Sequence, residues 1–183
     1  MRSLLYSVAI VSIVAAAEST ATAQNYRQMY NPSAAGGLGY IGGYRPYTAR
    51  TYSGHAINHA QTLQYYGKNS ASIPQATAQE HAAEIRRNLD AFGKEIAKLP
   101  KEFENDPEAK KLIVEIREHQ VAAAKHCGML ESECAKHMSA GGTVASCCND
   151  MLTHLRAADA AHDKLMKYLG VPMPGKATPD GKK

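Results

Sequence analysis

The sequence predicts an all-α protein, an up-down-up-down four-helix bundle with a disordered N-terminal arm and a disordered C-terminal tail. Four segments between residues 53 and 170 carry apolar or histidine side chains at steps of three and four residues, which is the spacing of one helix face. Proline and glycine separate these segments at short intervals. Helices joined by such short turns favour antiparallel neighbours in a bundle.

The first 23 residues have the composition of a secretory signal peptide. Arg2 supplies a positive start, an apolar run extends from Leu4 to Ala17, and Ala21 and Ala23 give a small-x-small cleavage site. This run is shorter than the roughly 20 apolar residues that cross a bilayer. We therefore expect cleavage after Ala23, export to the periplasm or the extracellular space, and no membrane span in the mature chain.

Residues 24–52 are rich in tyrosine and glycine, and this composition predicts a flexible arm. Its tyrosines are candidate contacts to an envelope or matrix protein, although a plain linker is the simpler interpretation. Residues 171–183 are rich in proline and glycine and predict a disordered tail. The net charge of +4 is mild, and mixed runs such as 84–87 are typical of solvated helix faces, so we expect no nucleic-acid partner.

The first helix is expected over residues 53–68 and the second from Pro74, which suits a first helical turn, to Pro100, which stops it. On the first helix, one predicted face carries polar and aromatic side chains: His55, His59, Thr62 and Tyr66. On the second, the predicted core stripe is mostly apolar: His81, Ile85, Leu89, Phe92, Ile96 and Leu99.

The third helix is expected to begin with Asp106 as its N-cap and Pro107 at its first position. Its predicted core stripe includes two histidines: Leu112, Ile116, His119, Ala123, His126 and Leu130. Gly141-Gly142 then breaks the chain, Thr143 is a candidate cap for the fourth helix, and Gly170 is expected to end it. The fourth helix offers two adjacent inward rows: Val144, Cys147, Met151, His154 and Ala158, beside Cys148, Leu155, His162 and Leu169.

Folding the last two helices about Gly141-Gly142 predicts that His126 lies next to His154 and that His119 faces His162. The same construction on the first two helices brings His81 near the level of His59. We therefore expect His59, His81, His126 and His154 to converge toward one end of the bundle. A deeper group is expected to comprise His119 and His162, together with His55.

Imidazoles that converge inside a bundle favour a transition metal ion such as Zn, Cu or Fe, which bind neutral imidazole nitrogen. Carboxylates near the histidines are candidate auxiliary ligands or acceptors that orient the rings: Glu84, Glu115, Asp150 and Asp159. Two interpretations without metal remain open. The histidines would form either a hydrogen-bonded polar core or a core that responds to pH.

The expected architecture resembles the ferritin-like di-iron and hemerythrin-like bundles, which draw metal ligands from facing helices. The di-iron pattern requires Glu-x-x-His on two helices. This chain has the reversed order in His81-x-x-Glu84 and only Asp159-x-x-His162 in the forward sense. The resemblance therefore extends to architecture, and we do not infer oxygen or ferroxidase chemistry from it.

Four cysteines in an exported chain favour disulfides, because the compartment is oxidising. The predicted register sets Cys134 opposite Cys147, where a bridge would join the last two helices near their turn, and it leaves the pairing of Cys127 and Cys148 open. The competing interpretation is a thiol site for Cu(I). Its soft auxiliary ligands would be methionines: Met129, Met138 or Met151.

Taken as a sequence, the chain is expected to be an exported metal-binding bundle for storage, buffering or sensing. The alternative is a metal-free, disulfide-stapled structural or interaction module of the cell envelope. We do not predict an enzyme, since the sequence has no Gly-x-Ser-x-Gly, no phosphate-binding loop and no His-Glu-x-x-His.

Overall fold

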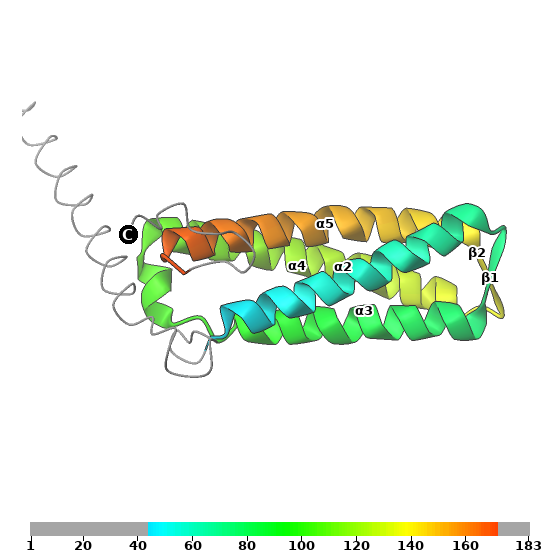
Figure 1. Ribbon diagram of the computed structural model, residues 1–183, viewed down its shortest axis with the longest axis horizontal. Coiled ribbons are helices and arrows are strands. Elements are labelled where there is room, and N and C mark those ends of the chain that lie inside the picture. The colour runs from blue at the N-terminus through cyan, green and yellow to red at the C-terminus, as the bar shows by residue number, and fades with distance from the viewer. Residues whose placement is uncertain (1–43, 172–183) are drawn as a thin grey trace, which may run out of the picture.

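The computed structural model describes residues 44–171, which form the predicted four-helix bundle (Figure 1). The predicted signal peptide, residues 24–43 of the predicted arm and residues 172–183 of the predicted tail lie outside the described residues. A short 3-10 helix, η1, spans Lys101–Asn105 and connects the second and third long helices. The four long helices are α2 (Pro46–Asn69), α3 (Gln75–Ile96), α4 (Pro107–Cys134) and α5 (Gly141–Tyr168).

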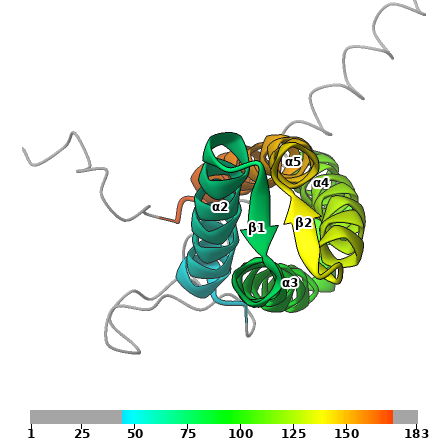
Figure 2. The ribbon, with the colours of Figure 1, turned by 90° about the vertical axis from the view of Figure 1, so that its right-hand side faces the viewer.

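Each long helix contacts two neighbours, so the four occupy the corners of a square (Figure 2). Helix α2 packs against α3 and α5, and α4 packs against α3 and α5. The α2–α3 seam and the α4–α5 seam therefore lie on opposite sides of the bundle (Figure 2). None of the helices among residues 44–171 is long and apolar enough to cross a membrane.

A two-stranded antiparallel sheet closes one end of the bundle, and the sequence analysis did not predict it. Strand β1 (Ser72–Pro74) lies in the α2–α3 turn and strand β2 (Met138–Ala140) in the α4–α5 turn. Ile73 pairs with Ser139 at the centre of the register, and both residues are buried. The pairing ties the two hairpin turns together (Figure 2).

Helix α2 begins at Pro46, which is earlier than the predicted start at residue 53. Pro46 occupies the first turn, where its missing N–H costs nothing, and Ala49 is buried. The Tyr44 ring is fully buried against the far end of the bundle. Residues 44–52, which the composition predicted to be part of a flexible arm, therefore belong to the bundle. Burial of their apolar side chains stabilises this segment despite the glycines that precede it.

The predicted caps at Asp106 and Gly170 are confirmed, and the predicted cap at Thr143 is wrong. The Asp106 side chain accepts hydrogen bonds from the backbone N–H groups of Glu108 and Ala109, as expected of an N-cap. Gly170 has a φ of 72° and ends α5 in a Schellman motif, in which the Val171 N–H bonds the Met166 carbonyl. Thr143 does not cap α5, because the helix already begins at Gly141 and leaves Thr143 inside its first turn.

The core face of α2 is rotated from the predicted one, whereas on α4 the predicted apolar residues are buried and the two histidines lie at the edge of the buried face. On α2 the predicted face is wrong: His55, Thr62 and Tyr66 are exposed and His59 is half-buried. On α4, His119 and His126 flank the core stripe and are half-buried. The buried residues of α2 are mostly small: Pro46, Ala49, Ser53, Ala56, Ala60, Leu63 and Gly67. Those of α4 include two thiols: Ala109, Leu112, Ile113, Ile116, Ala123, Cys127, Leu130, Glu133 and Cys134.

Candidate metal centre

Three imidazoles meet at the α4–α5 seam. The Nδ1 atoms of His119 on α4 and His154 on α5 lie 3.2 Å apart. The ring of His126, two helical turns after His119, stacks on the His154 ring with centroids 5.6 Å apart and an interplanar angle of 20°. The predicted neighbours His126 and His154 are thus confirmed, and His154 is the residue that both α4 histidines share.

His126 has a buried Nδ1 atom with no hydrogen-bond partner among the described residues. An unpaired buried nitrogen costs free energy, which a ligand or a bound cation would recover. Burial lowers the pKa of His154, and the positive charges that His119 and His126 would carry lower it further. The His154 imidazole is therefore held neutral at neutral pH, which is the form that binds metal ions.

A second histidine pair lies at the α2–α3 seam. The Nδ1 atoms of His59 and His81 are 3.1 Å apart, which confirms that the two residues share one level. The Tyr66 ring lies beside His81, with centroids 5.9 Å apart. Burial lowers the pKa of His81, as does the positive charge that His59 would carry, so the His81 ring is also held neutral at neutral pH.

The predicted convergence of His59, His81, His126 and His154 on one site is wrong. The first two lie at the α2–α3 seam and the last two at the α4–α5 seam, on opposite sides of the bundle (Figure 2). Among residues 44–171, no three His, Cys, Asp or Glu side chains are placed to hold one metal ion. The reason is that the buried face of α2 is rotated from the predicted one and that His119 and His126 lie at the edge of the buried face of α4, which leaves the histidines at the seams.

His162 does not face His119, and its predicted place in a second histidine group is also wrong. Its ring is fully buried at the far end of the bundle, where the Tyr44 hydroxyl bonds its Nε2 atom and the Phe92 ring meets it edge-on. Its Nδ1 atom has no partner among the described residues. Burial lowers the pKa of His162 to about 4. No sequence pattern indicates this pairing, since Tyr44 follows two glycines in the predicted arm.

The predicted auxiliary carboxylates mostly form ion pairs. Glu84 pairs with Arg87 and Glu115 with Lys164. Asp150 is exposed, one turn before His154. The Asp159 carboxylate accepts a hydrogen bond of 2.7 Å from the Ser53 hydroxyl and lies beside Arg50. His55, the remaining candidate, is exposed on α2.

All four cysteines are buried free thiols, so the predicted Cys134–Cys147 disulfide is not formed in this structure. They lie in the core cluster at the sheet end of the bundle, together with Met151. The sequence predicted that the cysteines lie near the α4–α5 turn, and the structure confirms this position. Met129 and Met138, the other predicted soft ligands, are exposed.

Comparisons of the chain with protein-family models, with curated proteins and with solved structures found no match.

Proposed function

We propose that the protein binds a divalent transition metal ion, Zn²⁺ or Cu²⁺ in the first place, through the imidazoles of His119 and His154. Its role would be the storage, buffering or sensing of that ion in the exported compartment. The observation that carries the proposal is the Nδ1–Nδ1 separation of 3.2 Å between the two rings.

This separation matches the geometry of a shared ion. Two imidazole nitrogens that each lie about 2.0–2.1 Å from a tetrahedral Zn²⁺ are roughly 3.3–3.4 Å apart. The observed 3.2 Å requires a shift of only a few tenths of an ångström, which a small rotation of either ring provides. Water would complete the coordination shell, because the seam is half-buried.

His126 would stabilise this centre from the side. Its ring already stacks on His154, and its unpaired Nδ1 atom would gain a partner by turning toward the ion or toward a water bound to it. The lowered pKa of His154 reduces the competition from protons. The stacked His126 ring distinguishes this seam from the His59–His81 pair.

The His59–His81 pair would form a second, weaker centre. Its Nδ1–Nδ1 separation of 3.1 Å is similar, but its third ring is Tyr66, which is a poorer ligand for these ions than imidazole. Two centres on opposite seams would fill independently, since they share no side chain.

A metal-free structural module is the second candidate function, and the same distance favours it. When one ring of a pair is protonated at Nδ1 and the other is not, an N–H donates to the bare nitrogen at 3.1–3.2 Å. Replacing His126 and His154 together by leucine separates the two functions. A structural module keeps or gains thermal stability without any dependence on metal, whereas a metal-binding protein loses the ion.

Calorimetric titration of the metal-free mature chain with Zn²⁺ and with Cu²⁺ tests the proposal. We expect the double variant His119→Ala/His154→Ala to lose the tighter site and His59→Ala/His81→Ala to lose the weaker one. The matched control is His55→Ala, which removes an exposed histidine and is expected to change neither site. Unaltered binding in the His119→Ala/His154→Ala variant, or no binding by the unaltered chain, would contradict the proposal.

A further inference from the structure

The residues that lead into α2 are fastened to α5 by a buried hydrogen bond between Tyr44 and His162. Both rings are fully buried, and their centroids lie 6.1 Å apart at an interplanar angle of 74°. The Tyr44 hydroxyl and the His162 Nε2 atom form the hydrogen bond. The Nδ1 atom of the same imidazole is buried and has no partner among the described residues. We call residues 44–53 the clasp, because they hold the start of α2 to α5.

Arg50 and Ser53 extend the clasp along α5. Arg50 forms an ion pair with Asp163, and its guanidinium also lies 3.9 Å from an Asp159 carboxylate oxygen. The buried Ser53 hydroxyl donates a hydrogen bond of 2.7 Å to the Asp159 carboxylate. These contacts all reach the C-terminal half of α5, so the clasp is attached at the end of the bundle away from the sheet.

A proton added to His162 would be poorly accommodated in this site. A protonated imidazole carries an N–H on both ring nitrogens, and the N–H at Nδ1 would find no acceptor among the described residues. Burial and the nearby Glu95 carboxylate raise the pKa of Tyr44, so its hydroxyl stays protonated and supplies no negative charge. A buried charge with so few partners is far less stable than the same charge in water.

The charged groups that face His162 do not compensate for its burial. Asp159 on α5 favours the added proton, whereas Arg50 on α2 opposes it. From α3 the Phe92 ring meets the imidazole edge-on, with centroids 6.3 Å apart. Burial is the largest effect, and it lowers the pKa of His162 to about 4. Helix α4 contributes apolar side chains to this core cluster: Ala109, Leu112, Ile113 and Ile116.

The sheet end of the bundle does not depend on the clasp. Its core cluster and the cluster around His162 have no residue in common within residues 44–171, and the β1–β2 pairing closes that end. Gly54 follows the clasp directly, and a glycine inside a helix weakens the helix. Helix α2 can therefore open as far as Gly54 without disturbing Ala56, its first residue in the sheet-end cluster.

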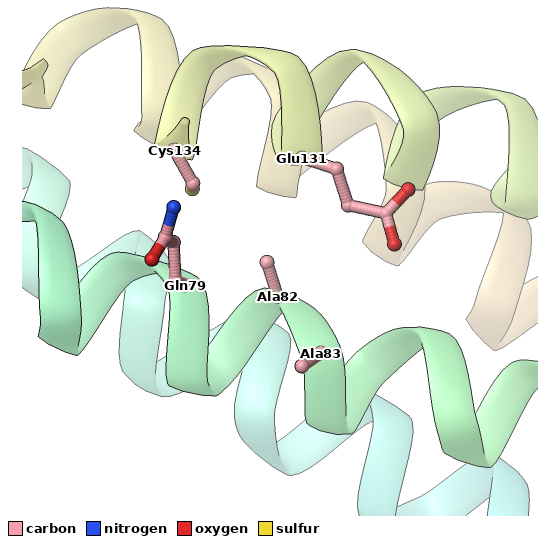
Figure 3. Close-up of a pocket in the computed structure, with 5 residues that line it drawn as sticks. All are labelled: Gln79, Ala82, Ala83, Glu131 and Cys134. Atoms are coloured by element: carbon pink, nitrogen blue, oxygen red, sulfur yellow. The ribbon is translucent and has the colours of Figure 1, made fainter. Parts of the chain in front are cut away.

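Mild acid also adds no charge to the core of the sheet end. Cys134 lies across from Gln79 in a pocket of about 210 Å³ between α3 and α4 (Figure 3), and burial raises the pKa of its thiol to about 11. The buried Glu133 stays ionised, because Lys136 and the Ala140 N–H lower its pKa. The seam histidines are half-buried, so a charge on them stays in contact with water. The buried charge that acid creates therefore lies at the clasp.

We propose that the clasp is released by acid: when His162 gains a proton, residues 44–53 detach from α5 while the sheet end of the bundle stays folded. Detachment lets water reach the imidazolium ring. The clasp is fully stable above about pH 6.5 and weakens as the pH falls toward 4, because the detached state binds the proton more tightly. Release would move the point where the preceding chain joins the bundle from Tyr44 to Gly54. The clasp shares no residue with the proposed metal centres, so this inference goes beyond the function proposed above.

Hydrogen exchange of residues 24–183, followed by NMR at a series of pH values and urea concentrations, tests the proposal. The amides of residues 49–53 bond within α2 and report on the clasp, whereas those of Ile85 and Leu152 report on the sheet-end cluster. After correction for intrinsic rates, protection of residues 49–53 should fall roughly 50-fold between about pH 7 and 4.5. It should be insensitive to low urea, as expected of local opening, while Ile85 and Leu152 stay better protected and respond to urea.

His162→Gln removes the titrating ring and keeps a side chain that can bond to the Tyr44 hydroxyl. In this variant the fall in protection of residues 49–53 with pH should disappear. The matched control is His55→Ala, which removes an exposed histidine from the same helix and should keep the whole fall. Circular dichroism checks that His162→Gln folds. If it does not, the measurements on the unaltered chain decide the question by themselves.

Three results would overturn the proposal. The first is protection of residues 49–53 that does not change between about pH 7 and 4.5. The second is protection and urea dependence identical to those of Ile85 and Leu152, because acid would then act only through unfolding of the whole bundle. The third is an undiminished fall in folded His162→Gln. None of these results bears on divalent ion binding by His119 and His154, so the two proposals fail separately.

Discussion

The Nδ1 atoms of His119 and His154 lie 3.2 Å apart across the α4–α5 seam, and the ring of His126 stacks on His154. The three rings stand beside the apolar core rather than within it. This position keeps them within reach of solvent ions while the helices fix their spacing. It is the relationship on which the proposed function depends.

Uptake of the divalent ion at this seam is expected to survive mild acidification. Burial and the neighbouring histidines lower the pKa of His154, so its ring stays neutral below the ordinary histidine value of about 6.5. Zn²⁺ titrations at a series of pH values would show protons competing for His154 only below that point. An affinity that already collapses between about pH 7 and 6.5 would contradict this expectation.

The buried pair Tyr44–His162 is expected to make the bundle sensitive to acid. The His162 pKa of about 4 lies below the unfolded value of about 6.5, so the folded state binds fewer protons in this window. The stability from this group is complete above about pH 6.5 and is lost as the pH falls toward 4, by on the order of 3 kcal/mol. Urea unfolding across this range measures the loss.

The double variant Tyr44→Phe/His162→Leu provides the control for this dependence of the unfolding free energy on pH. It removes the titrating ring and leaves no hydroxyl without a partner, so the fall in unfolding free energy between about pH 6.5 and 4 should be smaller. The exposed-histidine variant His55→Ala should keep the full slope. An unchanged slope in the double variant would assign the acid sensitivity to other residues.

The contact between α2 and the start of α5 is expected to tolerate no side chain at Gly67 or Gly141. A Cβ on Gly141 would lie 2.0 Å from the Ser70 carbonyl oxygen, and one on Gly67 would lie 2.6 Å from the Gly141 carbonyl oxygen. Gly141→Ala and Gly67→Ala should each lower the unfolding free energy by about 1–3 kcal/mol or more. Thermal unfolding followed by circular dichroism checks this.

Gly54→Ala and Gly142→Ala are the matched controls for the glycine contact. Both positions lie within helices, and a Cβ there would meet nothing within 4 Å. Alanine should therefore leave stability unchanged or raise it by up to about 1 kcal/mol through its better helix propensity. Equal losses of unfolding free energy in all four glycine variants would mean that glycine is needed for a reason other than this contact.

Asp106→Ala is expected to destabilise the bundle more than the loss of an ordinary N-cap. The Asp106 carboxylate accepts from two backbone N–H groups at the start of α4 and from the Tyr168 hydroxyl at 2.9 Å. Cap loss alone costs about 0.5–2 kcal/mol, and the Tyr168 hydroxyl would also lose its partner. Tyr168→Phe should cost less than Asp106→Ala in chemical denaturation, and the reverse order would contradict this account.

The sequence predicted the four helices partly because two of their ends carry strong signals: Pro107 and Gly170 mark helix ends by restrictions on backbone geometry that hold in any context. It did not predict the start of α2, since the burial of Tyr44 depends on contacts with residues more than a hundred positions away. The β1–β2 sheet was also missed. Its strands are only three residues long, which is too short for a recognisable alternating pattern.

The pairs His126–His154 and His59–His81 were predictable, whereas the His119–His154 contact and the separation of the two seams were not. Hairpin register places His126 beside His154 and His59 beside His81, because position along a helix depends only on residue count. Rotation about the helix axis depends on which side chains pack best. Alanine and cysteine give a weak periodic signal, so large imidazoles were assigned to the core positions that small side chains occupy.

Anomalous scattering from crystals of residues 24–183 grown with Zn²⁺ tests the central claim most directly. The account predicts an anomalous peak between His119 and His154, about 2.0–2.1 Å from each Nδ1 atom, which disappears in the His119→Ala/His154→Ala variant. Crystals whose anomalous map has no peak at this seam, with the two Nδ1 atoms still joined by a hydrogen bond, would contradict it.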